Sequence, residues 1–157
     1  MKRIYLLAVL MAFGVGVEAK KVDVVIDAEY AKTQAQEEKA VKEQCGHIKN
    51  NFKRWDCADE IYDAFRADGV IRGTEEYCQK HYFTLDTKPL FDKYLELGEL
   101  KKKARFSAIR PGEVTTDDLK SEQNYIKQEL INRWKKAHKD PWVEWHKLAD
   151  DGVVIKE

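Results

Sequence analysis

The sequence predicts an all-α protein, a small single-domain bundle of five to six helices. Long stretches of helix-forming residues carry apolar side chains three or four positions apart. Polar residues that favour helix caps separate these stretches, and the chain holds only eight Gly and three Pro. A hydrophobic content of 43% and an aromatic content of 11% exclude a disordered chain. The formal net charge of zero argues against nucleic-acid binding, which needs an excess of Lys and Arg.

An export signal is predicted at the N-terminus, over residues 1–19. Lys2 and Arg3 precede an apolar run over residues 4–17, and Val17 and Ala19 place small side chains before a cleavage point. The run is shorter than the roughly 20 apolar residues that a membrane span requires. We therefore expect cleavage after Ala19, one helical domain over residues 20–157, a periplasmic or secreted location and no stable membrane span. A retained N-terminal anchor is the alternative.

Two helices are expected in the first half of the mature chain. Residues 28–44 are strong helix formers with a thin, alanine-rich apolar stripe, so this helix should lie on the surface or extend from the body. Asn51 is the expected N-cap of the next helix, residues 52–67. The apolar residues of that helix fall on one broad arc, which predicts packing against more than one helix. The arc consists of Phe52, Trp55, Ala58, Ile61, Tyr62 and Phe65.

Four more helices are expected after residue 73. Thr74 should cap residues 75–83, and Thr87 should cap a helix that ends in the lysines of residues 101–103. Residues 116–138 keep Leu119, Ile126, Leu130 and Trp134 on one stripe, and residues 141–149 form the last helix. The β-branched segments 20–27 and 152–157 are either frayed ends or the two strands of a short β pairing.

Three cysteines in an exported chain predict one disulfide and one remaining thiol. If the chain reverses near Gly46, Cys45 and Cys57 face each other across a helical hairpin. If one unbroken helix runs through this region, those two cysteines lie about 18 Å apart along its axis, and Cys57 pairs with Cys78 instead. Gly46 and the asparagines at 50 and 51 are poor helix formers, which favours the pair Cys45–Cys57.

The sequence shows no motif of a common enzyme or cofactor site. It contains no Walker loop, no dinucleotide-binding glycine motif, no haem-attachment motif and no H-E-x-x-H. Cysteines and histidines at residues 45–47, 57 and 78–81 have the chemistry of zinc ligands without the spacing of a known zinc site. We therefore expect no cofactor, no metal and no catalytic residue. A periplasmic hydrolase that uses carboxylates and a metal-binding protein are the alternatives.

Two groups of residues are candidates for binding a partner. Four acids and no base occupy the face of the helix over residues 52–67 that lies opposite its apolar arc, whereas a merely solvated helix usually mixes both signs. Trp142 and Trp145 stand one turn apart and either close the core or anchor a partner. We expect an interaction module of bacterial or phage origin that binds another envelope or extracellular protein, with inhibition or exclusion as natural roles. The four acids are Asp56, Asp59, Glu60 and Asp63.

Overall fold

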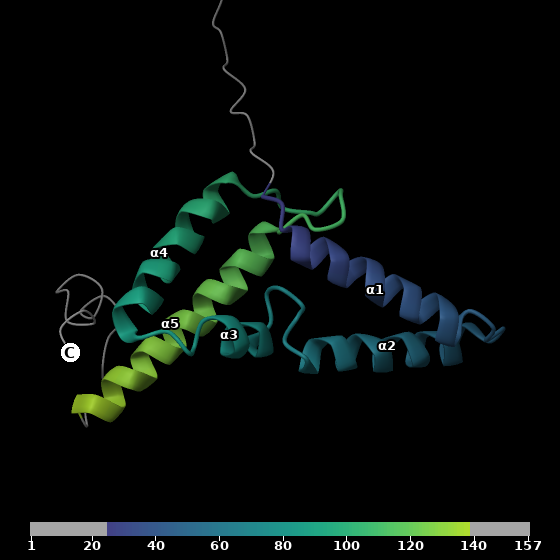
Figure 1. Ribbon diagram of the computed structural model, residues 1–157, viewed down its shortest axis with the longest axis horizontal. Coiled ribbons are helices and arrows are strands. Elements are labelled where there is room, and N and C mark those ends of the chain that lie inside the picture. Colours follow the sequence, from purple (N-terminus) through teal and green to yellow (C-terminus); the bar gives the residue numbers. More distant parts are fainter. Residues whose placement is uncertain (1–24, 139–157) are drawn as a thin grey trace, which may run out of the picture.

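The computed structural model describes residues 25–138, and within them the protein is all-helical, as predicted. Five helices follow one another along the chain (Figure 1): α1 (Ala28–Cys45), α2 (Asn51–Ala67), α3 (Glu75–His81), α4 (Thr87–Lys103) and α5 (Thr116–His138). The expected last helix, with Trp142 and Trp145, and the segment 152–157 lie outside the described residues.

The helices form a body and an arm. In the body, α4 and α5 run antiparallel and α3 packs against α5, whereas α1 and α2 form a hairpin that extends away from them (Figure 1). This hairpin of α1 and α2 is the arm. Its extension from the body agrees with the prediction from the thin apolar stripe of the first helix, which cannot support a wide core contact. The core of the body is made mainly by fully buried leucine and isoleucine side chains of α4 and α5: Leu90, Leu97, Leu119, Ile126 and Leu130.

The helix starts were predicted to within one residue. Thr74 caps α3 as expected, because its hydroxyl oxygen accepts a hydrogen bond from the backbone N–H of Tyr77 at 3.3 Å. Asn50, the residue before the expected cap, accepts from the N–H of Lys53 at 3.2 Å and begins α2. At the start of α4 the N-cap position is held by Asp86, one residue before the expected Thr87, without a side-chain hydrogen bond to the helix. Two neighbouring polar residues can both serve as a cap, so residue type alone does not choose between them.

The hairpin between α1 and α2 decides how the first two cysteines pair. The first helix ends at Cys45, the chain reverses over residues 46–50, and a disulfide joins Cys45 to Cys57 with 6.0 Å between their Cα atoms. The alternative of one unbroken helix is therefore wrong, and with it the pairing of Cys57 with Cys78. Cys78 is a free, buried thiol.

The segment before α1 pairs with the loop that leads into α5. Ile26 forms an antiparallel bridge with Glu113, and the N–H of Asp27 donates to the carbonyl of Gly112 at 2.8 Å. Gly112 has φ +77, and a Cβ there would lie 2.5 Å from the Asp27 carbonyl oxygen, so only glycine fits this crossing. The partner of this segment among the described residues is thus the loop before α5, and a pairing with residues 152–157 lies outside them.

Candidate functional site

The arm presents one face of α2 to solvent, and this face differs from the one that helical periodicity predicts. Ile61 is the buried residue of α2, whereas Phe52, Trp55 and Tyr62 are 72%, 57% and 39% exposed. The predicted packing of this arc against more than one helix is confirmed in part: α2 contacts both α1 and α3, but three of the six arc residues lie in solvent. The physical reason is the disulfide, because it turns the side of α2 that carries Cys57, and Ile61 one turn further on, toward α1.

The four predicted acids lie on the same solvent side of α2 as the exposed aromatic residues, so the prediction that they occupy the face opposite the apolar arc is wrong. All four are exposed, and within residues 25–138 none of them takes part in an ion pair. Of the three bases of this helix, Arg66 is paired with Glu76 of α3 at 3.3 Å, Arg54 donates to the Asn51 side chain at 2.9 Å, and Lys53 is exposed. Two of the aromatic rings, those of Phe52 and Trp55, meet edge to face with their centroids 5.5 Å apart. We call this surface the outer face of α2: Phe52, Trp55, Asp56, Asp59, Glu60, Tyr62 and Asp63.

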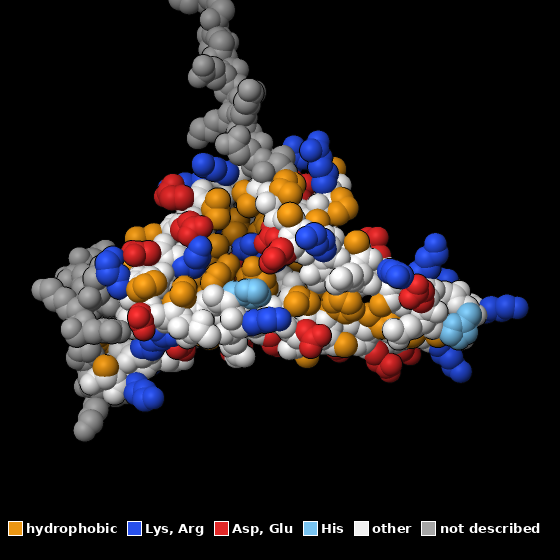
Figure 2. Space-filling model, in the orientation of Figure 1, with side chains coloured by type: hydrophobic (Ala, Val, Ile, Leu, Met, Phe, Trp, Pro, Cys, Tyr) orange, Lys and Arg blue, Asp and Glu red, His pale blue; other side chains and the backbone are white. Residues whose placement is uncertain are grey.

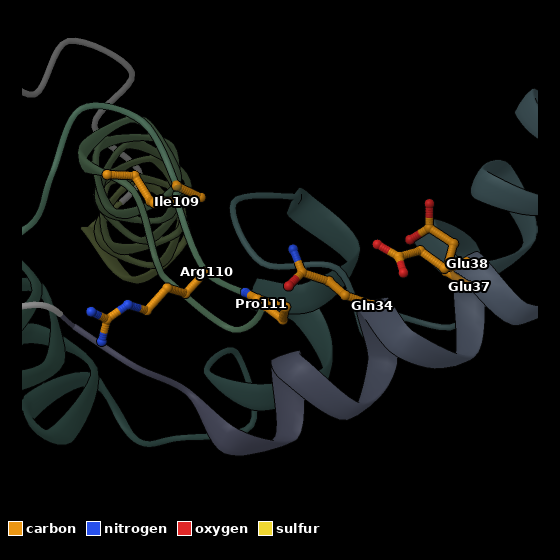
Figure 3. A pocket seen from close by; sticks show the side chains of 7 residues that line it. Gln34, Glu37, Glu38, Ile109, Arg110 and Pro111 are labelled. Atoms are coloured by element: carbon orange, nitrogen blue, oxygen red, sulfur yellow. The ribbon is translucent and has the colours of Figure 1, made fainter.

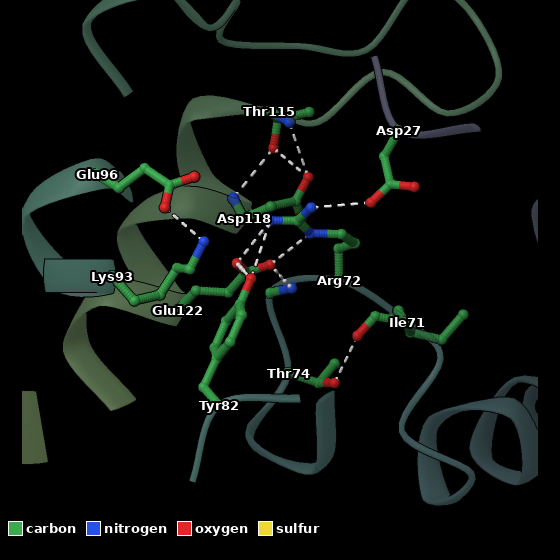
Figure 4. Close-up of polar contacts among 11 residues, drawn as sticks. Asp27, Ile71, Arg72, Thr74, Tyr82, Lys93, Glu96, Thr115, Asp118 and Glu122 are labelled. Carbon is green, nitrogen blue, oxygen red and sulfur yellow. Dashed lines mark hydrogen bonds and ion pairs between the residues drawn. The ribbon is translucent and has the colours of Figure 1, made fainter. Parts of the chain in front are cut away.

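A buried ion-pair network joins the arm to the body (Figure 4). The side chain of Glu122, on α5, has no solvent exposure and accepts four hydrogen bonds. Its Oε1 accepts from Nε of Arg72 at 2.8 Å and from the N–H of Gly73 at 3.0 Å, and its Oε2 accepts from Nη2 of Arg72 at 2.7 Å and from the Tyr82 hydroxyl at 3.0 Å. Nη1 of Arg72 reaches Asp27, the N-cap of α1, at 2.9 Å.

The charges and hydrogen bonds of this network shift the pKa values of its members. Burial opposes the charge of Arg72, but the hydrogen bonds and charge of Glu122 outweigh it, so the pKa of the guanidinium lies above its usual value. Burial, and then the neighbouring Glu122, raises the pKa of the Tyr82 hydroxyl. For Asp27, burial favours a higher pKa, but the N–H of Tyr30 and the Arg72 guanidinium lower it overall. With both Glu122 oxygens taken by two donors each, the network holds segments together and offers no carboxylate to a substrate.

Two surface hollows lie within the described residues. The larger, about 350 Å³, lies between α1 and residues 108–111 (Figure 3). Its acids are Glu37, which is half-buried, and Glu38, which is exposed; partial burial, and then the charge of Glu38, raises the pKa of Glu37. The smaller, about 210 Å³, includes Asp27, which is already occupied by Arg72. Neither hollow holds the two buried acids that a carboxylate hydrolase of the expected kind requires.

Thiol and metal chemistry find no support in the described part of the chain. Burial raises the pKa of the Cys78 thiol to about 12, so the nucleophilic thiolate is scarce at neutral pH. His81, three residues after Cys78 on α3, lies against Tyr77 with ring centroids 4.3 Å apart. Within residues 25–138 no three side chains of His, Cys, Asp and Glu are grouped to hold a metal ion. The other two cysteines are consumed by their disulfide.

Sequence reasoning missed the network of Arg72 and Glu122, although one signal was present. Glu122 lies between Leu119 and Ile126, three and four residues away, and therefore on the apolar stripe of α5. A charged residue in such a position indicates a buried ion pair, but nothing in the sequence identifies a partner 50 residues away. No helix within residues 25–138 has the length and apolarity of a membrane span. Comparison with known protein families, curated proteins and solved structures finds no match.

Proposed function

We propose that this protein is an exported binding module that holds another envelope protein through the outer face of α2. The observation that carries the proposal is the combination on one helix of three exposed aromatic side chains with four acids that have no ion-pair partner among the described residues. Tryptophan and tyrosine are enriched among the residues that carry most of the binding energy of protein interfaces. An excess of one charge on their border speeds the encounter with an oppositely charged partner.

The composition of the face indicates the chemistry of the partner. Asp56, Asp59 and Asp63 repel one another by a few tenths of a kcal/mol per pair, and a basic surface would relieve this repulsion. An arginine suits the face best, because its guanidinium can pair with a carboxylate while it lies over the ring of Trp55 or Phe52. We therefore infer a partner surface rich in Arg and Lys with apolar side chains at its centre.

The disulfide supports the same proposal. It ties the end of α1 to the first turns of α2, so the outer face is held in place before any partner arrives. Preorganisation of this kind lowers the entropy lost on binding. A disulfide is also the expected bond in an oxidising compartment, in agreement with the predicted export signal. Intact-mass analysis of the protein made in a bacterial host should show a chain that begins at Lys20, and a full-length species in the inner membrane would contradict export by cleavage.

The binding proposal is tested by charge substitution on the outer face. Crosslinking in envelope extracts first recovers the partner, and the association rate is then measured for Asp56→Asn, Asp59→Asn and Asp63→Asn combined. We expect association about tenfold slower, a weaker salt dependence, and a melting temperature that is unchanged or slightly higher. An unchanged association rate would show that these acids form only a solvated surface.

Two further variants complete the test. The matched control neutralises three exposed acids of α4, Asp92, Glu96 and Glu99, and should leave the rate close to that of the unmodified protein, because it makes the same change in net charge elsewhere. The variant with Phe52→Ala and Trp55→Ala should dissociate at least tenfold faster, since truncated interface anchors typically cost about 2 kcal/mol or more. If both triple variants slow association equally, net charge and not the outer face governs binding.

A further inference from the structure

The loop between α4 and α5, residues 104–115, has a fixed shape. Its base is closed by the N–H of Thr116, which donates to the Arg105 carbonyl at 2.8 Å. Its interior is organised by the carboxylate of Glu113, which is 1% exposed and accepts from the N–H groups of Ile109 at 2.9 Å and Arg110 at 3.2 Å. These bonds, Ile109 first, lower the pKa of Glu113 and keep the acid ionised. The loop is therefore held in one conformation from within.

This ordered loop holds two large hydrophobic side chains in water. Phe106 is 76% exposed and Ile109 is 73% exposed, the two most exposed large hydrophobic residues of the described chain. The hydrogen bonds that shape the loop are made by backbone N–H groups and the Glu113 carboxylate, so polar residues at positions 106 and 109 could form the same loop. The folding of the loop therefore does not explain why these two side chains are hydrophobic. Exposed apolar side chains on a rigid loop are typical of a surface that becomes covered.

Basic residues flank the two hydrophobic side chains in the sequence. Residues 101–112 contain five bases and no acid: Lys101, Lys102, Lys103, Arg105 and Arg110. Lys102 pairs with Glu99 and Arg105 faces Glu113 at 3.6 Å, which leaves the group with an excess of positive charge. The side chain of Arg110 points away from the acids of the neighbouring hollow (Figure 3).

The first described residue lies beside this loop. Val25 accepts a hydrogen bond from the N–H of Val114, near the end of the loop, at 2.9 Å. Figure 2 shows basic and hydrophobic side chains around the point where the grey trace begins. The sequence before Val25 adds Lys20 and Lys21 and, before cleavage, the apolar run of residues 4–17. Lys20 and Lys21 therefore add positive charge to the part of the mature sequence that precedes Val25.

From these observations we infer that the loop 104–115 docks on a phospholipid surface that carries anionic headgroups. Phe106 and Ile109 enter the boundary between headgroups and acyl chains, and the surrounding bases contact the headgroups. α2 lies at the edge of the molecule opposite the loop (Figure 1), so a docked protein keeps its arm in the aqueous compartment. This inference is independent of the binding proposed for the outer face of α2, because the two surfaces share no residue.

The test reads the environment of the loop itself in the full chain. Ser107→Cys, labelled with a polarity-sensitive fluorophore, places a probe between the two hydrophobic side chains. Cys78 is buried and the other cysteines are in a disulfide, so the new thiol is the accessible one among the described residues. Asn132→Cys, exposed in the last turns of α5 and distant from the loop, is the control site. Vesicles of phosphatidylcholine alone are compared with vesicles that also contain phosphatidylglycerol.

We expect a blue shift of the probe at residue 107 with phosphatidylglycerol vesicles, and none at residue 132. Phe106→Ser with Ile109→Ser should abolish the shift. Lys103→Gln with Arg110→Gln should raise the lipid concentration at half-saturation about 25-fold, since each base near an anionic surface strengthens binding about fivefold. The melting temperatures of both double variants should stay close to that of the parent protein, because the four substituted side chains are exposed to solvent.

Each contrary result overturns the inference. No shift at residue 107 would show that the loop stays in water, so that any vesicle binding comes from the N-terminal segment and the hydrophobic pair serves a protein contact. Equal shifts at residues 107 and 132 would indicate non-specific adsorption. A shift of the same size on phosphatidylcholine alone, or one that the Lys103 and Arg110 substitutions leave unchanged, would remove the role of anionic headgroups.

Discussion

Replacement of Glu122 by glutamine is expected to destabilise this protein more than any other single exchange of one polar side chain for another in the described chain. Its carboxylate is fully buried and accepts four hydrogen bonds, two of them from the Arg72 guanidinium. Glutamine keeps one acceptor oxygen and turns an N–H₂ group toward the donors of Arg72, Gly73 or Tyr82. The Arg72 charge then remains buried with only Asp27 to neutralise it.

The magnitude follows from what is lost. Breaking a buried ion pair by removal of one partner costs about 3 to 5 kcal/mol, and glutamine should fall near the lower end because it retains one acceptor. That is a large share of the roughly 5 to 15 kcal/mol that stabilises a typical domain. At an m value of about 1.5 to 2 kcal/mol/M, a loss of 3 kcal/mol lowers the urea midpoint by about 1.5 to 2 M.

The assay is urea denaturation followed by circular dichroism, with a matched Glu→Gln control. Glu99 pairs with Lys102 at the surface, where both side chains are 70% exposed, so Glu99→Gln should cost no more than about 0.5 kcal/mol. In a double-mutant cycle, Arg72→Met combined with Glu122→Gln should cost clearly less than the sum of the two single changes. A loss below about 1 kcal/mol for Glu122→Gln, or strict additivity with Arg72→Met, would refute the role assigned to this network.

Three further outcomes are expected. In the folded protein the pKa of Asp27 is lowered, because the effect of burial, which favours a higher pKa, is outweighed by the N–H of Tyr30 and the Arg72 guanidinium, so the unfolded protein binds this proton at a higher pH. The free energy of unfolding should therefore fall as the pH drops below about 4. Asp27→Asn should flatten this decline, as measured by thermal melts over about pH 2 to 7. Thiol titration without reductant should find Cys78 unreactive in the native protein and one reactive thiol after denaturation, and reductant should raise the count to three. Serine at both Cys45 and Cys57 should cost about 3 kcal/mol by the loop-entropy estimate, with hydrogen exchange increasing in α1 and α2 more than in α4 and α5.

The sequence by itself determined the helices and most of their ends. Caps such as Thr74, and the apolar stripe of Leu119, Ile126 and Leu130, are local signals that act within one or two turns. Poor helix formers after Cys45 were enough to favour the reversal that brings Cys45 to Cys57. All of these features depend on residues close together in the chain, where spacing and residue type carry the physical information.

Only the tertiary structure decided which sides of these helices are covered. Periodicity placed the aromatic residues of α2 on one arc, but the disulfide turned Ile61 inward and left Phe52 and Trp55 in solvent. The tertiary structure also pairs Arg72 with a glutamate 50 residues away. It places the segment before α1 beside the loop that precedes α5. Helical periodicity defines a face without defining its partner, and contacts between distant segments depend on the packing of the whole chain.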